Sequence, residues 1–138
     1  MTPRCKTPAA FLVLAAWSVS VGTADEPSLR SRYFDGLRQR GLFSLAESVC
    51  FEELARVDLD PDARLDATLQ LSRTLVEHAQ VTSGSQQQDL WTRAQAVLDR
   101  FTTAAPKHPE SLRVAIQAAL IPLAQGGYLA RLADLAPL

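Results

Sequence analysis

The stretch from residue 60 to residue 80 reads DPDARLDATLQLSRTLVEHAQ, and it decides the fold class of this chain. Asp60 is a favourable helix N-cap residue, and the proline that follows it is tolerated in a first helical turn. Apolar residues then recur three or four positions apart in two adjacent rows, which is the pattern of an amphipathic helix. The rows are Leu65, Leu69, Ser72, Val76 and Ala79, and beside them Leu71 and Leu75. A long helix is therefore predicted from Pro61 to Gln80.

Helix-breaking residues on both sides of this stretch divide the chain into further helices. The breaks are Gly41, the segment Thr82–Ser85, Pro106 and the pair Gly126–Gly127. The predicted helices span residues 27–40, 42–56, 61–80, 86–102, 110–124 and 128–136. No segment keeps the two-residue alternation of a strand for more than a few residues. The sequence therefore predicts an all-α fold, in which short connectors make neighbouring helices antiparallel.

The spacing also predicts which faces of the outer helices are buried. In the first helix, Leu29, Tyr33 and Leu37 lie four residues apart, with Phe34 beside them. The helix over residues 110–124 should pack through Leu112, Ala115, Ile116, Ala119, Leu120 and Leu123, and Pro122 should kink or end it. That helix is apolar on nearly every side, so it should be buried, and the short segment after it cannot cover it. We expect that the natural protein continues beyond Leu138, or that this end docks onto a partner or a second copy.

The start of the chain has the three parts of a secretory signal peptide. Arg4 and Lys6 make it positive, residues 9–21 are almost wholly apolar, and Gly22–Ala24 supplies small residues for cleavage. The apolar run of about 13 residues is too short for a spanning helix, which needs about 20. An uncleaved anchor and a buried helix are the alternatives. We expect residues 1–24 to be removed and residues 25–138 to form one exported domain, periplasmic or secreted, with no stable membrane span.

The composition of the chain excludes several functions. Its formal net charge is -1, and no cluster of Lys and Arg surrounds its sparse aromatic residues, so nucleic-acid binding is not expected. Cys50 is the one cysteine beyond the signal peptide, and its apolar neighbours predict a buried structural thiol. The acidic segment from Asp58 to Asp62 lacks the glycine and glutamate of a calcium loop. His78 and His108 each lack a nearby second zinc ligand. We therefore predict no catalytic, cofactor or metal site, and no enzyme activity.

Two of the predicted helices carry the same motif. Phe43-x-x-Ala46-x-x-x-Cys50 matches Trp91-x-x-Ala94-x-x-x-Leu98, and Tyr128-x-x-Arg131-x-x-x-Leu135 is a weaker third copy. The alanine allows two helix backbones to approach closely, and the aromatic residue fills the wedge where the pair of helices opens. One such pair cannot bury both of its apolar faces, so pairs stack in a row.

This pattern resembles the tetratricopeptide repeat (TPR) family, a class of helical repeat protein. The residues that match it are Tyr33, Leu37, Gly41, Phe43, Ala46, Cys50, Trp91, Ala94, Leu98, Pro106, Gly126 and Tyr128. The copies begin at residues 43, 91 and 128, so their spacing departs from the 34 residues of a regular TPR. The resemblance implies a short TPR-like alpha solenoid of about three antiparallel hairpins, the last incomplete. An irregular helical bundle is the alternative.

The same resemblance implies a function. Such arrays serve mostly as scaffolds, so the chain is expected to be a non-catalytic protein–protein interaction module outside the cytoplasm. It would bind a protein or peptide on its concave face, which the first helix of each hairpin lines. The candidate contacts are Arg30, Arg38, Arg73, Glu77, Arg113 and Gln117. Self-association through the C-terminal helices is also expected. The rival function is that of a small exported bundle that binds an apolar small molecule in its core.

Overall fold

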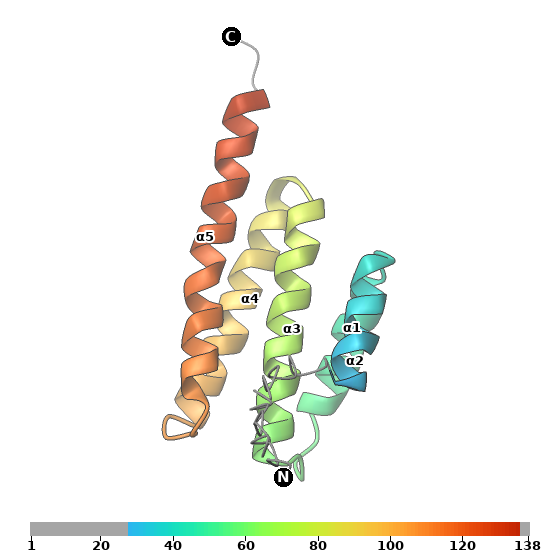
Figure 1. The fold of residues 1–138 in the computed structure, drawn as a ribbon, viewed down its shortest axis with the longest axis vertical. Coiled ribbons are helices and arrows are strands. Elements are labelled where there is room, and N and C mark those ends of the chain that lie inside the picture. Colours follow the sequence, from blue (N-terminus) through green and yellow to red (C-terminus); the bar gives the residue numbers. More distant parts are fainter. Residues whose placement is uncertain (1–27, 136–138) are drawn as a thin grey trace, which may run out of the picture.

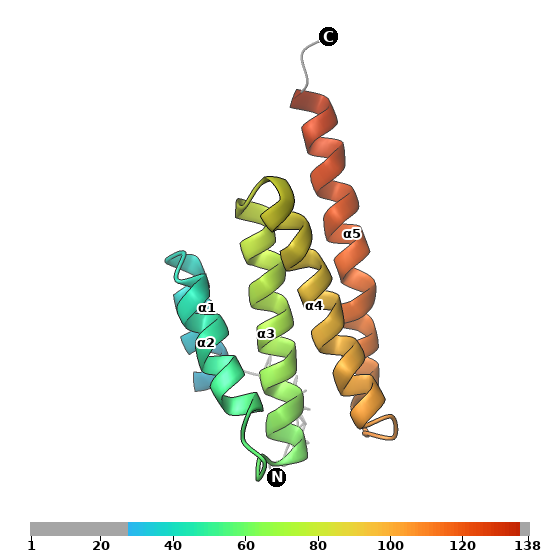
Figure 2. The same ribbon diagram turned by 180° about the vertical axis from the view of Figure 1, so that it is seen from behind.

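The protein is all-helical over residues 28–135, the part of the chain that this computed structural model describes; side chains are described to residue 127. The helices are α1 (Leu29–Gln39), α2 (Phe43–Leu54), α3 (Pro61–Val81), α4 (Gly84–Ala104) and α5 (Ser111–Leu135). Figure 1 shows α1, α3 and α5 on the side that faces the reader. Figure 2, drawn from behind, shows α2 and α4 on the opposite side. The prediction of an all-α fold is confirmed for the described residues.

The helix ends follow from capping residues and from glycine. Asp60 caps α3 as predicted, since its Oδ2 accepts hydrogen bonds from the backbone N–H groups of Asp62 (3.0 Å) and Ala63 (3.3 Å). Ser28 caps α1 through a bond from the Ser31 N–H at 3.2 Å, so the predicted start at residue 27 is too early. α1 ends before Gly41, whose φ of 71° lies in the left-handed region that glycine adopts without strain.

The closest packing in the molecule is between α3 and α4. Ser72 and Ala94 face each other there, both fully buried, and the Ser72 hydroxyl donates a hydrogen bond to the Ala94 carbonyl oxygen at 3.2 Å. Small side chains at this point let the two backbones come together. Ala46 and Cys50, the corresponding motif residues of α2, are also fully buried. The burial predicted for both motif alanines is confirmed.

The apolar face of α1 differs from the predicted one. Phe34 and Leu37 are buried, but Leu29 is 83% exposed and Tyr33 is about half exposed. The third buried residue of α1 is a charged one, Arg38, which the apolar pattern of the sequence could not include. α1 therefore turns a mixed face toward the rest of the molecule, one that is part apolar and part polar.

The last helix runs straight through its predicted breaks. α5 is continuous from Ser111 to Leu135, past Pro122 and the Gly126–Gly127 pair, so the separate helix predicted over residues 128–136 is wrong. Proline removes one intrahelical hydrogen bond, and each glycine costs about 1 kcal/mol relative to alanine. The leucine and alanine residues around them are strong helix formers and keep the segment helical. The third motif copy therefore lies on the same helix as the segment it was expected to pack against.

α5 also buries the opposite face from the predicted one. Among the side chains of α5 described up to residue 127, Val114 and Ile121, seven residues apart, are the buried ones, and α5 packs on α3 and α4. The predicted face is in solvent: Leu112 is 68% exposed, Ile116 53%, Leu120 49% and Leu123 70%. At 100° per residue, Leu112, Ile116 and Leu123 lie about 140–180° around the helix from Val114 and Ile121, and Leu120 lies about 100–120° away. The described part of the molecule thus leaves a continuous apolar stripe, Leu112–Ile116–Leu120–Leu123, uncovered.

Within residues 28–135, close backbone contacts join only helices that are near one another in the chain. α1 packs on α2 and α3, α2 on α3, α3 on α4 and α5, and α4 on α5. The C-terminal half of α5 rises beyond the turn that joins α3 to α4 (Figure 1). Among residues 28–135, no helix combines the length and the apolar character needed to cross a membrane.

Candidate functional site

A groove of about 340 Å³ lies where α1, α3 and α5 meet, on the face shown in Figure 1. Its lining is Ser31 from α1, Asp66, Leu69, Gln70 and Arg73 from α3, and Arg113, Ile116 and Gln117 from α5. Three of the predicted contact residues therefore lie in one groove, although they come from two helices: Arg73 from α3, and Arg113 and Gln117 from α5. The lining is mostly polar with two apolar residues, Leu69 and Ile116, which suits a polypeptide segment better than a purely apolar ligand.

The two arginines of this groove, Arg73 and Arg113, are exposed and charged. Arg73 is 52% exposed and forms ion pairs with Glu77 (Nε–Oε1 2.8 Å) and Asp35 (Nη1–Oδ1 3.3 Å). Arg113 is 57% exposed and pairs at 2.6 Å with Glu110, which immediately precedes α5. Exposed ion pairs contribute little stability, so these guanidinium groups can exchange their partners for another carboxylate at small cost.

Arg30, a further predicted contact, holds the first three helices together. Its guanidinium donates to Glu53 of α2, with Nη1–Oε1 at 2.6 Å, and to Asp66 of α3. These bonds raise the pKa of Arg30 above its usual range, chiefly through the hydrogen bond to Glu53. The same bond lowers the pKa of the Glu53 carboxyl. Arg30 thus fixes Asp66 at the edge of the groove.

Arg38 is the buried member of the predicted set. Its side chain is 1% exposed, and Nη1 donates to Gln70 Oε1 at 3.1 Å and to Thr74 Oγ1 at 3.2 Å. Nη2 donates to Asp35, and Nε lies 3.4 Å from Glu77 Oε2 without a hydrogen bond. The guanidinium therefore orients Gln70, which lines the groove, and does not itself reach solvent.

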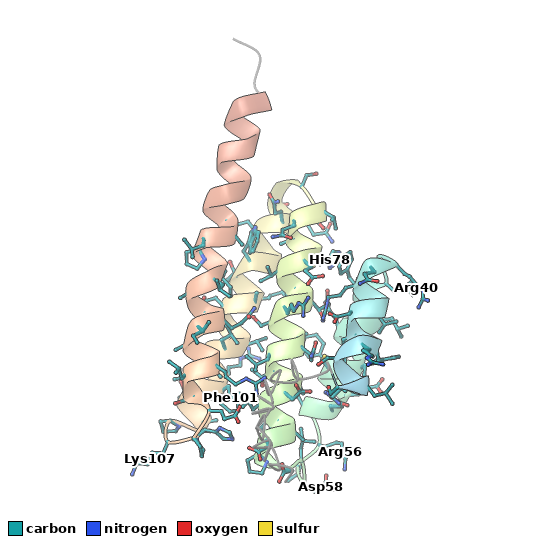
Figure 3. All side chains as sticks on the ribbon, in the orientation of Figure 1. Arg40, Arg56, Asp58, His78, Phe101 and Lys107 are labelled. Atoms are coloured by element: carbon teal, nitrogen blue, oxygen red, sulfur yellow. The ribbon has the colours of Figure 1, made fainter. Side chains whose placement is uncertain are left out.

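A second polar cluster joins α2, α3 and α4 near the turn between α3 and α4. His78, labelled in Figure 3, points from α3 toward the first hairpin and stacks on Phe43, with ring centroids 4.9 Å apart. His78 Nδ1 lies 2.9 Å from Glu47 Oε1, and Arg93 of α4 donates to Glu47 Oε2 at 3.2 Å. Sequence reasoning missed Glu47, although a carboxylate beside Ala46 on an apolar stripe was a signal that it has a partner.

The opposite face of the molecule carries a larger and more apolar cleft of about 630 Å³. It lies between the C-terminal ends of α2 and α4, above the first half of α3. Its lining is Phe51, Leu54, Ala55, Leu59, Pro61, Arg64, Thr68, Leu71, Val97, Arg100, Phe101, Ala104, Ala105 and His108. The sequence singled out none of these residues as a site, because they come from three helices and two connectors.

His108 closes one end of this cleft. Its Nδ1 accepts a hydrogen bond from the Glu110 N–H at 3.2 Å, and its Nε2 lies 3.2 Å from Asp62 Oδ1 at the start of α3. The ring also meets the edge of Phe101, which is labelled in Figure 3. His108 therefore links the connector after α4 to α3, a role that its place between two prolines did not reveal.

Cys50 is a structural thiol in this arrangement. It is fully buried, and burial is the main cause that raises the pKa of its thiol to about 12. A thiol with so high a pKa is a poor nucleophile near neutral pH. Within residues 28–135, no group of three or more His, Cys, Asp or Glu side chains could hold a metal ion.

Comparison of the chain with protein-family models, with curated proteins and with solved structures finds no match. Two surfaces of the described residues are candidates for binding: the groove of α1, α3 and α5, and the cleft of α2, α3 and α4.

Proposed function

We propose that this protein is a non-catalytic interaction module that binds an extended segment of a partner protein in the groove of α1, α3 and α5. The observation that carries the proposal is the composition of that groove. Arg73 and Arg113 offer exposed positive charge beside Leu69 and Ile116, so the groove can bind both carboxylates and apolar side chains. A segment that alternates acidic and apolar residues fits it best.

The packing of the helices supports a TPR-like array. In a stacked row each hairpin contacts only its neighbours, whereas a bundle with one core also brings distant helices together. In the part of the chain that the structure describes, α1 and α2 have no close backbone contact with α5, and α3 lies between them. α1 and α3, the first helices of the two hairpins, line the groove together with α5, which is the arrangement that the resemblance implies for a binding face.

Export is part of the proposal. The charged start, the apolar run and the small residues before Asp25 support removal of residues 1–24, which lie outside the described part of the chain. N-terminal sequencing of protein recovered from the periplasm or medium of an expressing bacterium should give Asp25 as the first residue. An intact Met1 in a membrane-bound product would contradict export by a cleaved signal.

Selection from a random peptide library displayed on phage, with the mature chain as bait, tests the binding function. Selected peptides should be enriched in acidic and apolar residues. Their binding should shift the backbone amide signals of residues in α1, α3 and α5 in NMR spectra of the protein. Arg113→Glu should weaken their binding by about tenfold, since it places like charges together. The matched control is Arg100→Glu, an exposed arginine of the opposite cleft.

Two outcomes would contradict this function. The first is a set of peptides whose binding is unchanged by Arg113→Glu. The second is a set that binds equally well after Ile116→Asp, which removes an apolar group of the groove and leaves Val114 and Ile121 to hold α5 in place.

A further inference from the structure

We propose that the cleft of α2, α3 and α4 is a separate binding site for a free amphipathic anion, a molecule with an unbranched apolar chain and a carboxylate at one end. This site is independent of the partner-binding groove, because the two lie on opposite faces and share no lining residue. Its volume of about 630 Å³ lies in the usual range of small-molecule sites.

The interior of the cleft is suited to an apolar chain. Leu71 and Phe101 are buried side chains of the core, and they form the floor together with Leu54 and Val97. Phe51 on α2 stands at the rim and is 43% exposed. An alkyl chain placed between α2 and α4 would cover this exposed ring and the apolar floor beneath it.

The charge of the cleft is opposite to that of the chain as a whole. The protein has a net charge of -1, yet the residues that line this cleft include two arginines and no Asp or Glu. Arg64 donates to the backbone carbonyl oxygens of Leu54 (3.1 Å) and Arg56 (2.8 Å), and these neutral acceptors do not cancel its charge. Arg100 is exposed on α4.

Neither arginine forms an ion pair within residues 28–135, whereas Arg30, Arg38, Arg73, Arg93 and Arg113 each face a carboxylate. A cation left without a carboxylate beside an apolar cleft favours an anionic head group with an apolar tail. The small volume and the closed end at His108 favour a free molecule over a lipid in a bilayer.

Fluorescence titration of the mature chain tests the site, with 11-(dansylamino)undecanoate as the probe and laurate as its competitor. Laurate should displace the probe, and dodecanol, its neutral counterpart, should bind about tenfold more weakly. Chain length provides a second measure: each methylene removed from the competitor should weaken binding by up to about fourfold.

Two variants, each with a matched control, locate the site. Arg100→Glu should weaken laurate binding by about tenfold, and Arg113→Glu, in the groove on the other face, should leave it unchanged. Ala104→Trp places a large ring at the mouth of the cleft and should abolish binding, whereas Ala119→Trp on the exposed side of α5 should not. Both alanines are exposed, so circular dichroism should show all four variants folded.

Several results would overturn the proposal. They are equal binding of laurate and dodecanol, equal binding by Arg100→Glu and the parent protein, and probe displacement that survives Ala104→Trp. Binding only to phosphatidylglycerol vesicles, or only to acidic peptides, would assign the cleft to a different occupant and would equally overturn it. The groove variants Arg113→Glu and Ile116→Asp test the partner-binding function separately, so that either proposal can fail alone.

Discussion

The two sides of α3 pack in different ways. Toward α4 the contact is made by small side chains: Ser72 meets Ala94 with both residues fully buried. Toward α1 the contact includes charged and polar groups: Arg30 pairs with Asp66, and Arg38 donates a hydrogen bond to Gln70. Close apolar packing depends on volume, whereas the ionic contact depends on partner geometry and on charge. We therefore expect the two sides to respond to different perturbations.

Overpacking the α3–α4 side should have the largest effect. Ala94→Trp should lower the free energy of unfolding by about 3 kcal/mol, because no space exists for an indole where the backbones meet. Ala46→Trp on α2 should be comparably destabilising. Urea denaturation measures both, and Ala119→Trp in solvent serves as the control. Unchanged midpoints for the two buried alanines would mean that the helix packing described here is wrong.

Removing the buried cation from the other side should cost less. Arg38→Leu keeps an apolar stem but leaves the Asp35 and Glu77 carboxylates without their buried partner. The cost should be about 2 kcal/mol, below the range for fully buried pairs because both carboxylates are about one-third exposed. Arg73→Leu removes a half-exposed partner of the same two carboxylates and should cost about 0.5 kcal/mol. Equal losses for the two variants, measured in urea, would show that the burial of Arg38 is unimportant.

Acid should weaken the ionic side selectively. The pKa of Glu53 is lowered in the folded protein by its hydrogen bond to Arg30, so this pair stabilises the fold above the unfolded-state pKa of about 4.3. The stabilisation is lost as pH falls through the lower, folded-state pKa. Glu53→Gln should therefore be less stable than the parent at pH 7, and the difference should shrink steadily as the pH falls below about 4.3. A difference that does not change with pH would exclude the ionic contribution; Glu52→Gln, an exposed neighbour, is the control.

Up to residue 127, α5 packs on the rest of the molecule through one side only. Substitutions on its exposed side should therefore hardly change the free energy of unfolding. Replacing Leu112, Ile116 and Leu120 by glutamine should alter the free energy of unfolding by less than about 0.5 kcal/mol per site. The parent chain should nevertheless bind a hydrophobic-surface dye and self-associate in sedimentation, because the apolar stripe is uncovered. The triple variant should do neither. A parent chain that stays monomeric and binds no dye would show that this stripe is covered.

The contrast between the two sides of α3 also explains what could be predicted from the sequence. The first four helices, the capping by Asp60 and the burial of Ala46 and Ala94 follow from local residue patterns, and they were predicted; the continuity of α5 was not. Periodicity alone cannot tell which of two apolar faces is buried when both exist, and α5 has two. Its prediction therefore selected the exposed face.

The polar contacts were harder to predict for a different reason. Arg30 and Arg38 were selected as surface residues because sequence reasoning treats an arginine as exposed. Their partners, Asp66 and Gln70, lie more than 30 residues away in the chain and are recognised only when α1 lies beside α3. The cleft residues were missed for the same reason, since three helices and two connectors contribute them.

The restriction of backbone packing to near neighbours has a consequence for local motion. Because the α1–α2 hairpin reaches the rest of the molecule mainly through α3, it can detach without disturbing the Ser72–Ala94 contact. The polar groups it would uncover, such as Gln70 and Thr74, can be solvated at once, which lowers the cost of opening. Opening of this hairpin would remove Ser31 from the groove and Phe51 from the cleft together. The shape of both surfaces therefore depends on where this one hairpin lies.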